Sequence, residues 1–224
     1  MEVLQSVLDF FLHLDQHLHT MIIDYGVWIY LILFLIIFVE TGLVVMPFLP
    51  GDSLLFAAGA FCAGVVASEG EVAKLSLGLV LVLLSVAAIL GDSLNYYLGE
   101  KIGLKVLNWK FRGKPIVNPK YIEQTQAFYE KNGPKTIIIA RFVPIVRTFA
   151  PFVAGIGSMR YSTFIKYNII GGLVWVVGLT LLGYFFGNIP WVKDNFETVI
   201  FGIIGFSLLP MVWEFINAKF IKKS

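Results

Sequence analysis

The sequence predicts an all-α integral membrane protein with inverted repeats. Each repeat would hold a re-entrant helical hairpin and a transmembrane helix, and an N-terminal amphipathic helix would precede them. Hydrophobic residues make up 58% of the 224 residues and charged residues only 14%, whereas about 25% of a typical soluble domain is charged. Apolar runs long enough to cross a bilayer recur along the chain. Two of these runs, far apart in sequence, are interrupted by prolines and charged residues.

The composition also excludes several classes of function. A chain this apolar is not a soluble enzyme domain, a disordered chain or a nucleic-acid binder, and its net charge of +2 predicts no partner. The single cysteine, Cys62, excludes an internal disulfide and a thiolate metal cluster. All three histidines lie between residues 13 and 19. We therefore expect no metal and no cofactor.

Residues 1–24 carry apolar side chains at helical spacing and polar side chains on the opposite face. They contain no lysine or arginine, which argues against a secretory signal peptide. We expect an amphipathic helix that either lies at the membrane interface or packs against the other helices.

Glycines, prolines and charges divide the rest of the chain, which we expect to form a single membrane domain. A spanning helix needs about 20 apolar residues, so the long apolar run broken at residues 47–51 must contain more than one segment. In order, we expect a transmembrane helix at 26–46, a re-entrant hairpin at 47–68, a transmembrane helix at 75–99, a basic cytoplasmic segment at 100–133, a second re-entrant hairpin at 134–159, transmembrane helices at 161–187 and 196–216, and a basic tail at 217–224.

Basic residues predict the orientation of these segments. The stretch 100–135 carries eight lysines and arginines, and the tail carries three lysines, so both should be cytoplasmic. With both termini in the cytoplasm, residues 134–159 begin and end inside, whereas residues 47–68 begin and end outside. The two hairpins should therefore enter the membrane from opposite faces.

The two hairpins resemble each other in sequence. Interrupted segments at matching places in two oppositely oriented halves are typical of transporters built on inverted repeats. Non-helical backbone at membrane depth must be buried in protein or line a wet cavity, so the hairpin tips should meet around such a cavity. The residues expected to shape the hairpins are Pro47, Pro50 and Gly51 in the first, and Pro144, Pro151 and Gly155 in the second.

Five ionisable residues interrupt the apolar runs: Glu40, Asp52, Asp92, Arg141 and Arg147. Each costs roughly 2.5–3.5 kcal/mol at the bilayer centre on insertion scales, unless it is paired or hydrated. Acids in the first half and arginines in the second half predict ion pairs between the halves. The sequence does not tell which acid meets which arginine.

Arg147 lies between Pro144 and Pro151, where a helix break would leave backbone amides free. A planar guanidinium suits bidentate binding of phosphate, and free amides would add to an anion site. We expect Arg147 and Arg141 to bind an anionic substrate. The alternative for both is a structural ion pair.

The three acids have different alternatives. Glu40 is expected to carry a proton, because a desolvated carboxylate resists ionisation. Asp52 follows Pro50 and Gly51 and is either a second proton-coupling residue or a helix N-cap. Asp92 is expected either to support the site or to bond to a neighbouring helix.

The tetrapeptide Gly-Asp-Ser-Leu occurs at 51–54 and again at 91–94. It resembles a hydrolase signature, but that chemistry needs a soluble α/β fold and a partner histidine. Because every histidine lies within residues 13–19, we do not expect an enzyme.

Residues 40–59 (ETGLVVMPFLPGDSLLFAAG) and 140–155 (ARFVPIVRTFAPFVAG) resemble the two signature hairpins of the DedA family, part of the wider SNARE-associated (VTT-domain) group. The resemblance covers nearly the whole chain. It implies a bacterial inner-membrane protein with two opposed hairpins that supports envelope homeostasis and depends on the proton motive force. The membrane acids and arginines needed in that family fall on Glu40, Asp52, Arg141 and Arg147.

The resemblance implies a flippase that recycles undecaprenyl phosphate across the inner membrane. Arg141 and Arg147 would hold the phosphate, and Glu40 and Asp52 would carry protons. The partners would be that lipid, or a phospholipid, and protons. Three alternatives stay open: a phospholipid scramblase or translocase without proton coupling, a proton-coupled antiporter of small cations or drugs, and an assembly factor that transports nothing.

Overall fold

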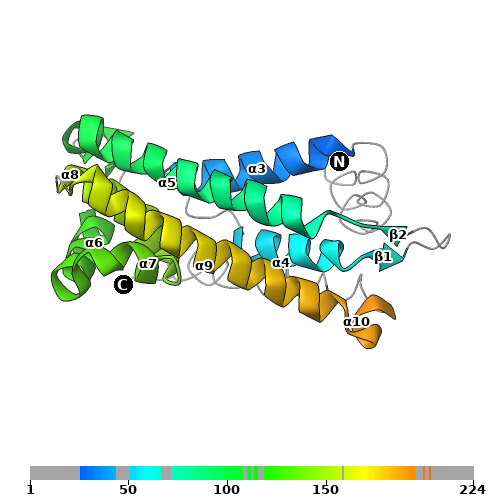
Figure 1. Ribbon diagram of the computed structural model, residues 1–224. Helices are drawn as coiled ribbons and strands as arrows, with labels where there is room; N and C mark the ends of the chain where they lie inside the picture. Colours follow the sequence, from blue (N-terminus) through cyan, green and yellow to red (C-terminus); the bar gives the residue numbers. More distant parts are fainter. Residues whose placement is uncertain are drawn as a thin grey trace, which may run out of the picture. The chain divides into compact units, whose positions relative to one another are not determined.

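The computed structural model describes residues 26–43, 51–66, 72–107, 110–111, 114–115, 119–157 and 159–194, with 199 and 202 (Figure 1). Several predicted features lie outside these residues. They are the amphipathic helix at 1–24, the hairpin prolines Pro47 and Pro50, nearly all of the span at 196–216, and the tail at 217–224.

The fold is helical, as the sequence predicts. The helices are α3 (Val27–Gly42), α4 (Gly51–Cys62), α5 (Leu77–Leu107), α6 (Pro119–Asn132), α7 (Thr136–Ala140), α8 (Pro144–Ile156), α9 (Tyr161–Gly187) and α10 (Pro190–Asp194), with a 3-10 turn at Gly133–Lys135. Two short antiparallel strand pairs were not expected. They are β1 (Val65–Val66) with β2 (Val72–Ala73), and β3 (Lys110–Phe111) with β4 (Lys114–Pro115). In the chain, the first pair lies between α4 and α5 and the second between α5 and α6.

Two of these helices are long and apolar enough to cross a membrane, over Leu77–Gly103 of α5 and over Tyr161–Gly187 of α9. At about 1.5 Å per residue, each stretch reaches about 40 Å, longer than the roughly 30 Å hydrocarbon core. Large apolar side chains such as Val82, Leu90, Leu173 and Phe185 lie exposed on them. Surfaces of this kind are suited to lipid rather than to water.

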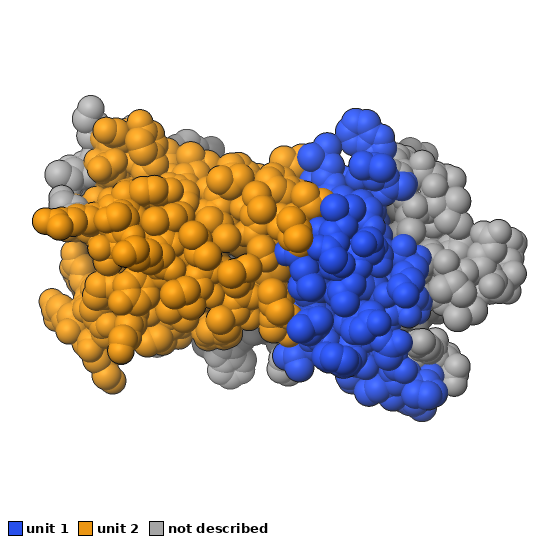
Figure 2. Space-filling view, viewed as in Figure 1, with its two compact units in different colours: residues 1–33, 50–81, 179–224 blue, residues 34–49, 82–178 orange. Residues whose placement is uncertain are grey.

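The chain divides into two compact units (Figure 2). Unit 1 comprises residues 1–33, 50–81 and 179–224, and unit 2 comprises residues 34–49 and 82–178. The division falls within α3, α5 and α9, so each of these helices contributes residues to both units.

Within unit 1, α4 packs closely on the last two turns of α9. A Cβ added at Gly59 would collide with the backbone of Thr180 and Tyr184, and one added at Gly183 would collide with the backbone of Phe56. Only glycine allows two helix backbones to approach this closely. The Phe56 and Phe186 rings pack together beside this contact, with centroids 5.5 Å apart.

Within unit 2, α8 packs on α5 through the same pattern. A Cβ at Gly155 would collide with the backbone of Tyr96 and Glu100, and one at Gly99 would collide with the backbone of Phe152. α6 covers another side of α8 through a buried cluster of Ile122, Phe149, Phe152 and Val153. This packing fixes α8, and with it the side chains that α8 carries, against α5.

Replacing Gly155 with alanine should destabilise the protein by about 1–3 kcal/mol, the usual cost of overpacking. The added methyl group has no space, because it meets the α5 backbone. Gly178→Ala is the matched control, since nothing lies within 4 Å of a Cβ at Gly178. Thermal unfolding of both variants in detergent measures the difference. Equal stability of the two variants would contradict the close α5–α8 contact.

Candidate functional site

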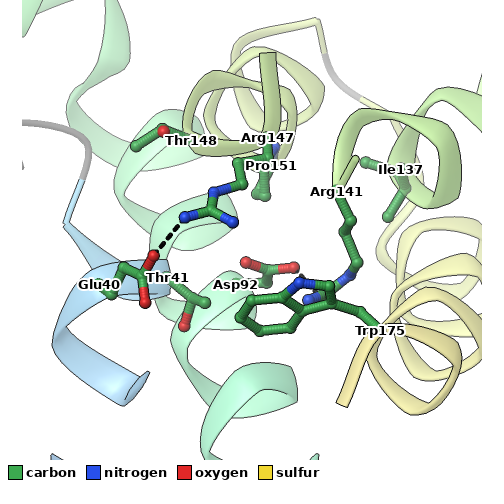
Figure 3. Close-up of a pocket in the computed structure, with 9 residues that line it drawn as sticks. All are labelled: Glu40, Thr41, Asp92, Ile137, Arg141, Arg147, Thr148, Pro151 and Trp175. Atoms are coloured by element: carbon green, nitrogen blue, oxygen red, sulfur yellow. Dashed lines mark hydrogen bonds and ion pairs between the residues drawn. The ribbon is translucent and has the colours of Figure 1, made fainter. Parts of the chain in front are cut away.

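A pocket in unit 2 gathers most of the charged residues that the sequence singles out (Figure 3). The space between its side chains, counted together with the open solvent at its mouth, is about 450 Å³. Its walls come from the end of α3, the middle of α5, the α7–α8 region and α9. The lining residues are Glu40, Thr41, Asp92, Ile137, Arg141, Arg147, Thr148, Pro151 and Trp175.

The first ion pair joins α8 to α3. Arg147 Nη2 donates to Glu40 Oε1 at 2.5 Å. Arg147 belongs to the first turn of α8, which begins at Pro144, a residue with its backbone already set for a helix start. The side chain of Glu40 is 5% exposed, whereas that of Arg147 is 17% exposed. The guanidinium is thus the more accessible member of this pair.

The second ion pair joins the α7–α8 turn to α5 and is more deeply buried. Arg141 Nη2 donates to Asp92 Oδ2 at 2.5 Å and to Asn168 Oδ1 at 2.6 Å. The side chains of Arg141 and Asp92 are 6% and 7% exposed. Asn168 in turn donates from Nδ2 to the carbonyl oxygen of Ile89. This arginine is therefore held by two partners, Asp92 of α5 and Asn168 of α9, and Asn168 is itself bonded to the α5 backbone.

Trp175 of α9 brings the two pairs together. Its buried indole ring lies 5.6 Å from the guanidinium carbon of Arg141 and 5.6 Å from that of Arg147. Both distances lie within the range of cation–π attraction, which is strongest for tryptophan. The ring thus supports both cations from one side of the pocket.

Asn95 of α5 fixes the backbone next to the Arg147–Glu40 pair. Its Nδ2 donates to the carbonyl oxygens of Thr41 and Thr148, at 3.1 and 2.9 Å. Thr41 adjoins Glu40 and lies near the end of α3, where the last carbonyls have no donor within the helix. The fully buried amide therefore ties α3 and α8 to the same point of α5.

The pocket therefore holds two guanidinium groups, each paired with a carboxylate. A guanidinium that donates to a carboxylate can donate in the same geometry to a phosphate. Among the described residues, no group of three His, Cys, Asp or Glu side chains could hold a metal ion.

The structure pairs two of the predicted acids with the two predicted arginines. Asp92, which was expected to support the site or to bond to a neighbouring helix, is the partner of Arg141, and Glu40 is the partner of Arg147. Asp52 lies in the first turn of α4, in unit 1, and is not among the described residues that line the pocket. It is the second residue of the helix, so it lies inside the first turn and not at the N-cap position.

The hairpin residues have distinct places. Gly51 begins α4 and Pro144 begins α8. Pro151 lies inside α8 and lines the pocket, whereas Gly155 packs on α5.

Three further residues were missed by the sequence reasoning: Asn95, Asn168 and Trp175. All are uncharged, so a search for charges in apolar runs passes over them. One signal was available, because Asn168 and Trp175 are seven positions apart and thus lie on one face of a helix. The glycines between them, Gly171 and Gly172, lie on that face as well and leave room for Arg141.

Two long apolar helices, packed with shorter helices that carry buried ion pairs, are typical of a helical membrane protein. The family model of the VTT domain matches residues 49–185. The chain belongs to this family, the DedA family.

Relatives of this chain are known from several bacteria. It is 52% identical to Protein DedA of Escherichia coli strain K12 over 219 residues, which cover 98% of this chain and 96% of the relative. It is 41% identical to an uncharacterized membrane protein of Mycobacterium tuberculosis strain H37Rv, over 79% of this chain and 74% of the relative. It is 35% identical to Inner membrane protein YqjA of E. coli K12, over 72% of this chain and 69% of the relative. No solved structure matches it.

Proposed function

We propose that this protein is a translocase of lipid phosphates, and not an enzyme, that returns undecaprenyl phosphate across the bacterial inner membrane under the proton motive force. The observation that carries the proposal is the Arg147–Glu40 ion pair, which is partly exposed in a pocket. A phosphate that reaches Arg147 can replace the carboxylate, and Glu40 then takes a proton. Release of the phosphate restores the pair.

The setting of the pair favours a lipid over a free anion. The pocket lies among helices whose outer surfaces are apolar. A lipid could place its phosphate on Arg147 while its tail remains in the bilayer. The protein then needs to screen only the headgroup, which suits a small pocket.

The proposal extends to the architecture. α4 has 12 residues and α8 has 13, which at about 1.5 Å per residue makes each about 18–20 Å long, too short to span a bilayer. Each packs on a long helix through glycines at matching positions. Both features support two re-entrant hairpins in inverted repeats. Asp52 lies in the first turn of α4, as Arg147 lies in the first turn of α8.

Relatives support the location. YqjA is named an inner membrane protein, and the mycobacterial relative is named a membrane protein. We propose the same location here, with several membrane spans and both termini in the cytoplasm.

Reconstitution tests the function. Purified protein in liposomes should move a polyprenyl phosphate between leaflets faster than protein-free vesicles do, and an imposed pH gradient should accelerate the movement. Movement of a phospholipid at a rate independent of the gradient would favour a phospholipid scramblase instead. Flux of a small cation or drug without lipid movement would favour an antiporter.

The replacement Glu40→Gln should uncouple transport from the proton gradient. Glutamine keeps the size of the side chain and an oxygen that accepts from Arg147, but it cannot gain a proton. In this variant we expect transport to persist at a lower rate and to be equally fast with and without the gradient. The ratio of the rates with and without a gradient is the measurement. A ratio equal to that of the wild type would show that Glu40 does not couple protons.

A further inference from the structure

We propose that the pocket selects a phosphate group that carries one negative charge over a phosphate group that carries two. A phosphodiester, or a phosphomonoester that retains one proton, would meet this condition. The inference rests on the proposed function and specifies the charge state of its substrate.

The charges that face the pocket are balanced. Two acids, Glu40 and Asp92, face two arginines, Arg141 and Arg147, and the other described lining residues are uncharged. Figure 3 shows the Asp92 carboxylate between the two guanidinium groups. On the α6 side, the Tyr129 hydroxyl donates to the carbonyl oxygen of Ala150, and burial raises the pKa of this hydroxyl, so it adds no charge.

One of the two pairs is closed to a ligand. The Arg141 side chain is only 6% exposed, and it donates to both Asp92 and Asn168. Its Nε is buried without a hydrogen-bond partner among the described residues, so a ligand does not reach that atom. The α9 backbone packs on this nitrogen at Gly171, so closely that an added Cβ would lie 3.1 Å from it. The guanidinium has little room to turn away from Asp92.

The other pair is open to a ligand. The side chain of Arg147 is nearly three times as exposed as that of Arg141, at 17% against 6%. A phosphate can therefore compete for this guanidinium, while Arg141 stays with Asp92. One cation of the pocket, and not two, is available to the ligand.

The charge balance then fixes the substrate. When a singly charged phosphate takes the place of Glu40 on Arg147 and Glu40 gains a proton, the pocket stays neutral. A doubly charged phosphate would leave one uncompensated negative charge among apolar helices, where isolated charges are costly. Protonating Asp92 to compensate would leave Arg141 buried without an anionic partner, which is costly as well.

Two lipids with the same acyl chains test the inference. Phosphatidic acid is a monoester whose phosphate loses a second proton at a pKa of about 6, whereas phosphatidylmethanol is a diester with one charge throughout. The dissociation constant of each lipid is measured with the full chain in detergent at pH 5.5 and pH 8. The ratio of the two constants removes any common effect of pH on the protein.

The ratio of the monoester constant to the diester constant should rise roughly 77-fold between pH 5.5 and pH 8, the change in abundance of the singly charged monoester for that pKa. A ratio that stays constant or falls would overturn the charge selection while leaving lipid-phosphate binding intact. Binding of neither lipid would overturn the proposed function itself.

Asp92→Asn provides an independent test. The variant keeps an oxygen that accepts from Arg141 and removes one negative charge from the pocket, so it should accept a doubly charged phosphate. At pH 8 the preference for the diester should shrink about tenfold or more relative to wild type. Glu130→Gln makes the same charge change on an exposed α6 position and should leave the preference unchanged. An equal preference in Asp92→Asn and wild type would overturn the inference, and the wild-type ratio decides alone if the variant does not fold.

Discussion

Arg147→Ala should reduce transport of a polyprenyl phosphate by more than about 100-fold while leaving the protein folded. Charge-assisted hydrogen bonds contribute about 1.5–3 kcal/mol each, and a bidentate guanidinium makes two of them with a phosphate. The fold should tolerate the change because Glu40, which is 5% exposed and loses this ionic partner, takes a proton as it does in the proposed cycle. Initial rates in proteoliposomes measure the effect.

Two companion variants sharpen this result. Arg147→Lys should retain part of the rate, because lysine keeps the charge but lacks the planar pair of donors. Arg160→Ala removes an exposed arginine just before α9 and should transport at the wild-type rate. If Arg147→Ala transports as fast as Arg160→Ala, then Arg147 does not bind the substrate.

Arg141→Met should lower the free energy of unfolding by about 3–5 kcal/mol, the typical cost of removing one partner of a buried ion pair. The loss should be large because Asp92 would remain buried at 7% exposure with its ionic partner gone. Asn168 would also lose the donor to its Oδ1. Thermal or denaturant unfolding in detergent measures the loss.

The double variant Arg141→Met with Asp92→Leu should be more stable than Arg141→Met alone. Replacing both members of a buried pair with apolar groups of similar size is often neutral, whereas breaking the pair is not. Stability losses that simply add would contradict an interaction between the two side chains. The cycle thus tests whether Arg141 has a structural role distinct from that of Arg147.

Much of the fold could be predicted because a bilayer leaves few choices. A run of apolar residues such as 161–187 gives a long helix, and the structure forms α9 over these same residues. Helix ends that lie in polar sequence were harder to predict. The apolar run ends near residue 99, but α5 continues to Leu107. Its last turns do not need apolar side chains, so hydrophobicity does not mark their end. The short strand pairs depend on turns that hydrophobic periodicity does not reveal.

The charged residues of the candidate site were predicted from the sequence, but which acid pairs with which arginine was not. An arginine and an acid in apolar sequence must find partners, which identified Glu40, Asp92, Arg141 and Arg147. Which of them meet depends on how α3, α5 and α8 pack, and that in turn depends on contacts such as Gly155 against α5. Asn95 and Asn168 cost less to bury than a charge does and therefore gave no comparable signal.

The most direct test measures whether the lipid phosphate lies on Arg147. Solid-state NMR of protein with ¹⁵N-labelled arginine, in bilayers containing a polyprenyl phosphate, reports the dipolar coupling between phosphorus and guanidinium nitrogen. We predict a strong coupling that disappears in Arg147→Lys and persists in Arg160→Lys. A coupling that survives Arg147→Lys, or one that is absent from the wild type, would contradict phosphate binding by Arg147.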